Sequence, residues 1–312
     1  MSKNPPDNIL LGVGIIIATV FAMALADAIV KYASADFPLW QIFVLRSLLA
    51  LPLLFALLRV ARASARPLSL KWSILRSALL VLMYVAIYAA APLLSLSVIA
   101  ASLYTGPIFV ALFSALLIGE PVGARRWSAV LLGFAAVLVI LRPDTDAFSF
   151  YMLVPVLAGL LYALAAIITR AKCVHEKPLA LAIMLNWTLV AGGLLASIAV
   201  FLAQPLFAGR YPFLLGNWVA MGAAEWGVIA SLALLMVIIG TGLAKAYQSA
   251  PPSIIATFDY SYLLFAAFWG WVFFAERPDA HTAAGMLMIV IAGMLAVWKP
   301  EARAPVNPQP AP

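Results

Sequence analysis

Several ionisable side chains stand inside long apolar stretches, where each charge needs a structural or functional reason because lipid solvates it poorly. Asp27 and Lys31 are four residues apart, so a helix places them one turn apart on the same face. This spacing fits an internal ion pair, and it equally allows Asp27 to bind a substrate ammonium or to carry a coupling proton. Arg46 can hold a carboxylate through two hydrogen bonds, bind helix carbonyls or pair with Asp27. Asp259 has no basic residue within one turn and is the better candidate for a functional acid.

Aromatic side chains form a second group of candidates. Tyr84 and Tyr88 are one helical turn apart, Tyr104 follows in the next apolar stretch, and Trp187 stands in the middle of a later one. Tyrosine combines an apolar face with a hydroxyl group, which suits a pocket for amphipathic solutes. The alternative is an aromatic belt at the membrane surface. We therefore expect a substrate site from Tyr84, Tyr88, Tyr104, Trp187, Arg46 and Asp259, with Asp27 and Lys31 as a coupling or structural ion pair.

Residue types that carry catalysis or bind metals are scarce. The single Cys173 excludes a disulfide framework or a paired-cysteine metal site. The two histidines, His175 and His281, fall in connections, which counts against a zinc hydrolase or a histidine-based membrane protease. Nothing resembles a nucleotide-binding P-loop. The sequence therefore predicts a protein that is not an enzyme and that uses no metal and no cofactor.

The composition places the chain in lipid. Of its 312 residues, 66% are hydrophobic and 10% are charged, whereas a soluble domain has roughly 45–50% apolar and about 25% charged residues. A membrane helix needs about 20 apolar residues, and only helices satisfy the backbone of such segments internally. We predict an all-α integral membrane protein with ten transmembrane helices, over residues 9–33, 38–58, 72–91, 94–118, 127–141, 149–170, 178–203, 225–247, 252–274 and 280–298.

The loops carry their Lys and Arg residues unevenly. With the N-terminus inside, 13 of them lie on the inner side and 3 on the outer side. Basic residues favour the cytoplasmic side, so both termini are predicted to be cytoplasmic. The formal net charge of +7 is then a consequence of topology, and the expected partner is the lipid bilayer, with no nucleic acid.

The chain contains an internal repeat. Residues 97–120 align with residues 253–276 at an offset of 156 positions. The identical pairs are Ser97/Ser253, Ile99/Ile255, Ala100/Ala256, Tyr104/Tyr260, Phe109/Phe265, Ala111/Ala267 and Glu120/Glu276. Chance sharing of Ala and Ile between apolar helices is the alternative explanation. With five spans per half, a second copy enters the membrane from the opposite side, and the substrate site is expected between the copies. The predicted units are residues 1–146, residues 147–299 and a disordered cytoplasmic tail at 300–312.

Each half ends in a Glu-containing turn before a short Gly-bearing helix, and in this the chain resembles the EamA-type repeats of the drug/metabolite transporter superfamily. Gly119-Glu120-Pro121 with Gly133 carries the resemblance in the first half, and Ala275-Glu276-Arg277-Pro278 with Gly285 and Gly293 in the second. The resemblance implies ten helices around a central cavity and export across the bacterial inner membrane by alternating access. Within the superfamily the chain is most similar to bacterial amino-acid exporters, including those for aromatic amino acids.

We therefore expect a secondary transporter that exports small amphipathic metabolites, with amino acids as the first choice. The cavity is expected between spans one to four and six to nine, with spans five and ten bracing the outside and Pro107 kinking the fourth span. The alternatives are an exporter of drug cations or nucleotide sugars, a membrane-embedded enzyme and a passive channel. A homodimer is compatible with the glycines that permit close helix contact.

Overall fold

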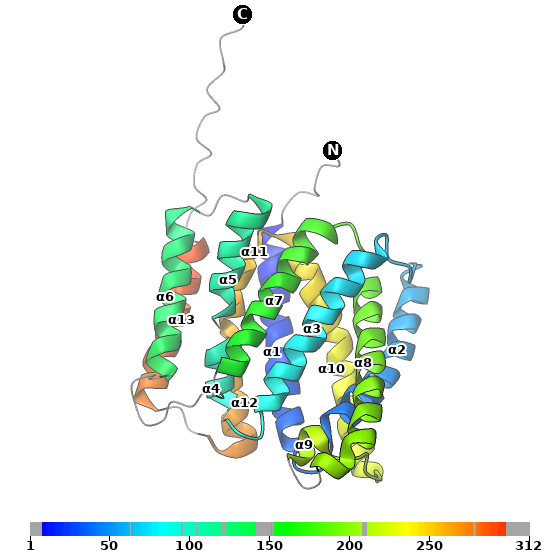
Figure 1. Ribbon diagram of the computed structural model, residues 1–312. Helices are drawn as coiled ribbons and strands as arrows, with labels where there is room; N and C mark the ends of the chain where they lie inside the picture. The colour runs from blue at the N-terminus through cyan, green and yellow to red at the C-terminus, as the bar shows by residue number, and fades with distance from the viewer. Residues whose placement is uncertain are drawn as a thin grey trace, which may run out of the picture.

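The structure is a computed structural model, and it describes residues 8–62, 64–94, 96–103, 105–119, 123–141, 151, 153–207, 211–276 and 279–297. Tyr104, Glu120 and the predicted tail at 300–312 lie outside the described residues. In the part described, the regular structure is helical (Figure 1), as the need to satisfy backbone groups within lipid requires.

Six of the described helices are long and apolar enough to cross a membrane. They are α1 (Ile9–Ala33), α2 (Leu39–Val60), α3 (Leu70–Ala90), α7 (Leu153–Lys172), α8 (Pro178–Phe207) and α10 (Ala223–Ser249). The shorter elements are α4 (Leu96–Leu103), α5 (Gly106–Phe113), the π-helix η1 (Ser114–Ile118), α6 (Ala124–Leu141), α9 (Pro212–Leu215), α11 (Pro252–Asp259), α12 (Ser261–Phe274) and α13 (Ala280–Val297). Each predicted apolar range coincides with helical residues, but two ranges are interrupted, and the count of ten spans stays a prediction.

The two interruptions fall at equivalent places in the proposed repeat. α4 ends at Leu103 and α11 ends at Asp259, which are 156 positions apart. The first break precedes Pro107, near the start of α5, where the missing N–H and the ring are incompatible with a continuous helix. Downstream, the left-handed residues Gly119 (φ 67°) and Ala275 (φ 54°), again 156 positions apart, end η1 and α12. Glycine adopts this conformation readily, whereas alanine pays a steric cost.

Helices of one half pack mainly on helices of the other. α1 packs against α10 as α7 packs against α3, α2 pairs with α8, and α6 pairs with α13. In Figure 1, α1 joins α2 at the lower side whereas α7 joins α8 at the upper side, so α1 and α7 run in opposite directions. The α6–α13 pair stands at one edge of the bundle, and α1, α3, α7 and α10 surround its centre.

The upper side of the bundle is held together by the turn between α7 and α8. The carboxylate of Glu176 accepts hydrogen bonds from the backbone N–H groups of Leu68 (2.8 Å) and Ser69 (2.7 Å), just before α3 begins. Gln248, at the end of α10, donates to the carbonyls of Cys173 (3.0 Å) and Glu176 (2.6 Å). A carboxylate at a helix start satisfies free N–H groups and complements the helix dipole. This turn thus connects α3 to α10.

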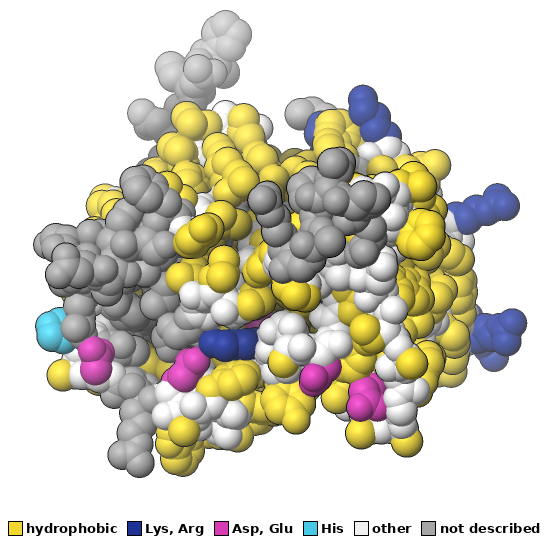
Figure 2. Space-filling view, turned by 60° about the horizontal axis from the view of Figure 1, so that its bottom comes forward, with side chains coloured by type: hydrophobic (Ala, Val, Ile, Leu, Met, Phe, Trp, Pro, Cys, Tyr) yellow, Lys and Arg dark blue, Asp and Glu magenta, His cyan; other side chains and the backbone are white. Residues whose placement is uncertain are grey.

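The surface is apolar along the helices and charged at their ends. Leu195, Phe201 and Leu202 on α8 are 69%, 68% and 73% exposed, as expected for side chains that face lipid. Figure 2 brings the lower side forward: acidic side chains gather there, whereas Lys and Arg lie mainly toward the opposite edge. The orientation predicted from the basic residues in the loops stays a prediction.

Candidate substrate site

Asp27 lies inside the bundle and is held by two tyrosines from distant parts of the chain. Its side chain is 6% exposed. Tyr88 of α3 donates to Oδ1 (2.9 Å), and Tyr262 of α12 donates to Oδ2 (2.5 Å). Because each carboxylate oxygen has a hydroxyl donor, the buried acid is compensated without an ion pair. Asp27 thereby joins α1 and α3 to the second half of the chain.

Arg46, on α2, is buried among aromatic rings and is 1% exposed. Its guanidinium carbon is 4.8 Å from the ring centre of Phe43, 5.5 Å from that of Tyr84 and 5.7 Å from that of Tyr88. Aromatic faces attract a cation but leave its N–H groups without acceptors. The Nε and Nη2 atoms of Arg46 are buried and have no hydrogen-bond partner. A buried cationic donor without an acceptor is costly, and an anionic ligand would remove that cost.

Tyr88 connects the two charges. Its hydroxyl binds Asp27 while its ring lies against Arg46 and stacks on Tyr84, with ring centres 5.8 Å apart and planes 12° apart. We call Asp27, Arg46, Tyr84, Tyr88 and Tyr262 the central cluster. It offers a buried guanidinium with two unpaired nitrogen atoms beside apolar ring faces, which is the chemistry that binds a carboxylate attached to an apolar body.

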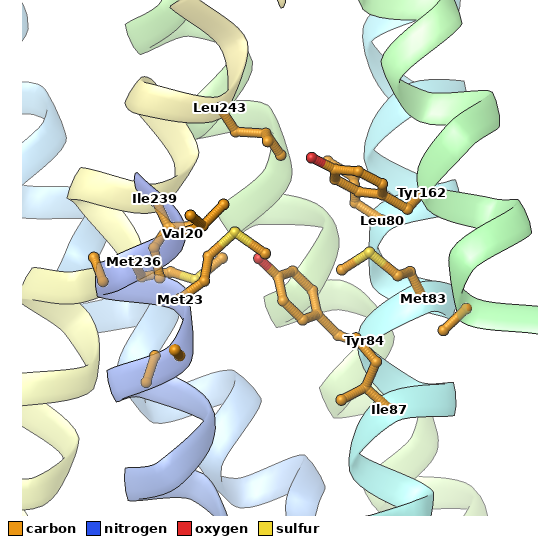
Figure 3. Close-up of a cluster of buried hydrophobic side chains, with 14 of the residues drawn as sticks. Val20, Met23, Leu80, Met83, Tyr84, Ile87, Tyr162, Met236, Ile239 and Leu243 are labelled. Carbon is orange, nitrogen blue, oxygen red and sulfur yellow. The ribbon is translucent and has the colours of Figure 1, made fainter. Parts of the chain in front are cut away.

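An apolar contact region lies beside the central cluster, between the α1–α10 pair and the α3–α7 pair (Figure 3). Met23 of α1 and Leu243 of α10 point toward Met83 of α3 and Tyr162 of α7, and the hydroxyl of Tyr84 points into the same space. Methionine side chains repack at low cost because they are unbranched and polarisable. The two pairs of helices therefore meet largely through flexible and apolar side chains.

A pocket of about 390 Å³ opens near the lower end of α3. It is lined by Ala89, Ala90, Leu93, Tyr151, Val154 and Tyr211. Tyr211, in the left-handed conformation at φ 45°, donates a short hydrogen bond to the carbonyl of Ala89. Burial raises the pKa of Tyr211 to about 12, so the hydroxyl remains a donor at physiological pH. The volume is suited to a small metabolite.

Lys31 does not form the ion pair with Asp27 that the spacing suggested. It bonds to Glu276 (3.0 Å) and to the carbonyl of Leu94 (3.2 Å), with its ammonium 5.0 Å from the ring centre of Phe274. The reason is geometric: Asp27 is turned toward two tyrosines in the core, whereas Lys31, a turn further on, reaches the end of α12. The ion pair connects the two halves.

We expect Lys31 and Glu276 to be energetically coupled. Their side chains are 17% and 26% exposed, so water screens the pair less than it screens a fully exposed pair. A double-mutant cycle with Lys31→Met and Glu276→Gln should give a coupling of about 1 kcal/mol in thermal or denaturant unfolding of the purified protein. Strictly additive effects of the two substitutions would contradict this. Lys245→Met, on an exposed lysine of α10, serves as the control for loss of a positive charge.

The other sequence-predicted residues have different outcomes. Asp259 is buried at the end of α11, at the helix break, within electrostatic range of Tyr247 and Tyr262. Trp187 is 49% exposed on the outside of α8, which corrects its assignment to the cavity: its neighbour Asn186 is the residue that faces inward. Tyr104 lies outside the described residues. Tyr262 was not predicted as a site residue. Its counterpart in the first half is Gly106, so comparison of the two halves does not single out Tyr262.

A helical bundle of this composition, with polar side chains buried at its centre, is typical of a multi-pass membrane protein. Residues 10–142 match the EamA-like transporter family. The match covers the first half of the chain, and with the relatives below it indicates a membrane transporter similar to the EamA family rather than an enzyme.

Several characterised transporters are similar to the chain. The pseudopaline exporter CntI of Pseudomonas aeruginosa is 28% identical over 290 residues, covering 91% of this chain and 95% of that protein. A riboflavin transporter of Vibrio cholerae is 26% identical over 275 residues, covering 86% and 87%. An S-adenosylmethionine uptake transporter of Rickettsia prowazekii is 24% identical over 198 residues, covering 62% and 60%. These relatives differ in substrate, and none of the three is an aromatic amino-acid exporter.

The fold also matches a solved structure. One crystal structure superimposes with a TM-score of 0.71, covering 92% of this chain and 95% of that one, at 16% sequence identity. At this level of identity the match supports the fold alone.

Proposed function

We propose that this protein is a secondary transporter that exports a small amphipathic metabolite bearing a carboxylate, with amino acids, aromatic ones included, as the first candidates. The chain is proposed to cross the inner membrane ten times, as two inverted five-helix halves with both termini in the cytoplasm. Transport would proceed by alternating access, through rocking of the halves and without covalent chemistry.

The observation that carries this proposal is the guanidinium of Arg46, which has two nitrogen atoms without a hydrogen-bond acceptor. Arg46 is buried, its Nε and Nη2 atoms have no acceptor, and the rings of Phe43, Tyr84 and Tyr88 surround it. A substrate carboxylate supplies two acceptors in the planar geometry that arginine prefers. The aromatic rings suit an apolar side chain on the same molecule.

The central cluster also favours this substrate class over drug cations. A lipophilic cation needs a carboxylate with accessible oxygens, but both oxygens of Asp27 already accept hydrogen bonds from Tyr88 and Tyr262. The group with unused hydrogen-bonding capacity is the cationic guanidinium of Arg46, so an anionic or zwitterionic substrate fits better. The methionines of the apolar contact region, Met23 and Met83 among them, would let the helix pairs separate during the cycle.

Counterflow in proteoliposomes tests the proposal. Vesicles loaded with unlabelled L-phenylalanine should accumulate external labelled L-phenylalanine transiently and faster than empty vesicles, because a carrier exchanges its substrate whereas a channel does not. Riboflavin, S-adenosylmethionine and a tetraphenylphosphonium cation serve as competitors of different chemistry. If no amino acid from a panel exchanges while the cation does, the proposed substrate class is wrong.

A further inference from the structure

A second buried arginine lies on the upper half of α3, outside the central cluster. Arg76 is 1% exposed, although a position two turns from the start of α3 would allow a long side chain to reach the membrane surface. Its Nε donates to Oγ1 of Thr169 on α7 (2.7 Å), and its Nη1 is buried without any hydrogen-bond partner. No carboxylate of the described residues lies within ion-pair distance of it. Arg76 is therefore a second cation with unused donor capacity.

Arg76 lies at a narrow crevice between helices, which is closed in this form. In this form the crevice has no room for a water molecule, and it is lined by Arg76, Leu80, Tyr162, Ala165, Ala166, Thr169, Leu243 and Tyr247. Tyr162 and Tyr247 meet edge to face there, with ring centres 6.1 Å apart. The lining comes from α3, α7 and α10, three of the four helices around the bundle centre. Like the central cluster, this crevice combines a guanidinium with tyrosine rings.

One face of α3 leads from this crevice to the central cluster. Arg76, Leu80, Tyr84 and Tyr88 follow one another at four-residue intervals, and all are buried. Such residues form a continuous stripe on a helix, and the eight positions from Arg76 to Tyr84 cover about 12 Å along its axis. At the lower end of this stretch, the ring centre of Tyr84 lies 5.5 Å from the guanidinium carbon of Arg46. The two arginines therefore stand at successive depths along one line through the bundle.

We propose that Arg76, with Tyr162 and Tyr247, forms a second anion-binding station on the cytoplasmic half of the transport path, where an organic carboxylate binds before it reaches Arg46. The inference deepens the proposed function and rests on it. A structural arginine in a membrane bundle normally uses its remaining N–H groups on helix carbonyls or acids. Arg76 instead donates Nε to the hydroxyl of Thr169 and leaves Nη1 without a partner at the crevice, which has to widen before an anion can enter. The path thus carries a positive charge at two depths, which selects anions along its length.

Carboxylate binding to purified protein tests the second station without requiring transport. Benzoate is the probe, benzamide is its uncharged control, and the readout is the benzoate-dependent rise in unfolding temperature. Two stations predict that Arg46→Gln and Arg76→Gln each retain part of the wild-type response and that the double variant loses it, because each occupied site adds its own stabilisation. A full wild-type response in Arg76→Gln, or complete loss in Arg46→Gln alone, would overturn the proposal.

Two further variants keep the test decisive. Arg59→Gln removes an exposed basic residue near the same side of the membrane and should leave the benzoate response unchanged, so a loss there would show a non-specific effect of charge and count against the second station. If Arg76→Gln does not fold, Arg76→Lys takes its place, because it retains the positive charge but not the planar guanidinium. In the Arg46→Gln background, Arg76→Lys should weaken the remaining benzoate response several-fold. An unchanged response would overturn the proposal.

The outcomes of the two proposals can be told apart. Two-station benzoate binding without exchange of any amino acid would disprove the amino-acid assignment and leave the second station standing. Amino-acid counterflow with a benzoate response that depends on Arg46 alone would support the amino-acid assignment and disprove the second station.

Discussion

Replacing Arg46 with glutamine should lower the counterflow rate of a carboxylate substrate at least about tenfold, while the protein still inserts and folds. A hydrogen bond to a charged group contributes about 1.5–3 kcal/mol, and about 1.4 kcal/mol corresponds to one factor of ten in affinity. Folding should survive because the substitution removes a buried cation whose Nε and Nη2 have no acceptor. The measurement is the initial counterflow rate, normalised to the amount of reconstituted protein.

Two controls accompany this substitution: a variant that keeps the positive charge, and a competitor that lacks the carboxylate. Arg46→Lys keeps the positive charge but loses the planar fork, so it should retain more transport than Arg46→Gln. The Arg46→Gln variant should also discriminate less between L-phenylalanine and its uncharged N-acetyl amide as competitors of uptake. If Arg46→Gln transports and discriminates like the wild type, then Arg46 serves only the packing of Phe43, Tyr84 and Tyr88.

The sequence predicts the helical segments well because lipid imposes simple rules on them. Length, apolar composition and charged ends define each segment, and the predicted ranges coincide with helices such as α1 (Ile9–Ala33) and α10 (Ala223–Ser249). The break after α4 was predictable from Pro107. The equivalent break at Tyr260 was not, because no proline stands there and only the tertiary packing shows it.

Most residues of the central cluster could be singled out from the sequence, but their hydrogen-bond and ion-pair partners could not, and their role in binding a substrate stays a prediction. Asp27, Arg46, Tyr84 and Tyr88 stand out because polar groups in lipid are costly, and all four meet in the central cluster. Their partners depend on how distant helices cross: Tyr262 is 235 positions from Asp27, and Glu276 is 245 positions from Lys31. Trp187 was misassigned because α8 is apolar on all sides, so its sequence does not distinguish the inner face from the lipid face.

The break between α4 and α5 depends on a close contact with α7, and a single methyl group there should destabilise the protein. A Cβ atom on Gly159 would lie 2.5 Å from the carbonyl oxygen of Leu103 and 3.0 Å from the backbone nitrogen of Gly106. Backbone atoms cannot rotate away as a side chain can, so we expect Gly159→Ala to cost about 1–3 kcal/mol in unfolding free energy. The control is Gly14→Ala on α1, where a Cβ meets nothing within 4 Å and alanine favours the helix by about 1 kcal/mol. Thermal unfolding in detergent should therefore shift down for the first variant and not for the second. An unchanged midpoint for Gly159→Ala would mean that α7 and the α4–α5 break do not approach each other as closely as described.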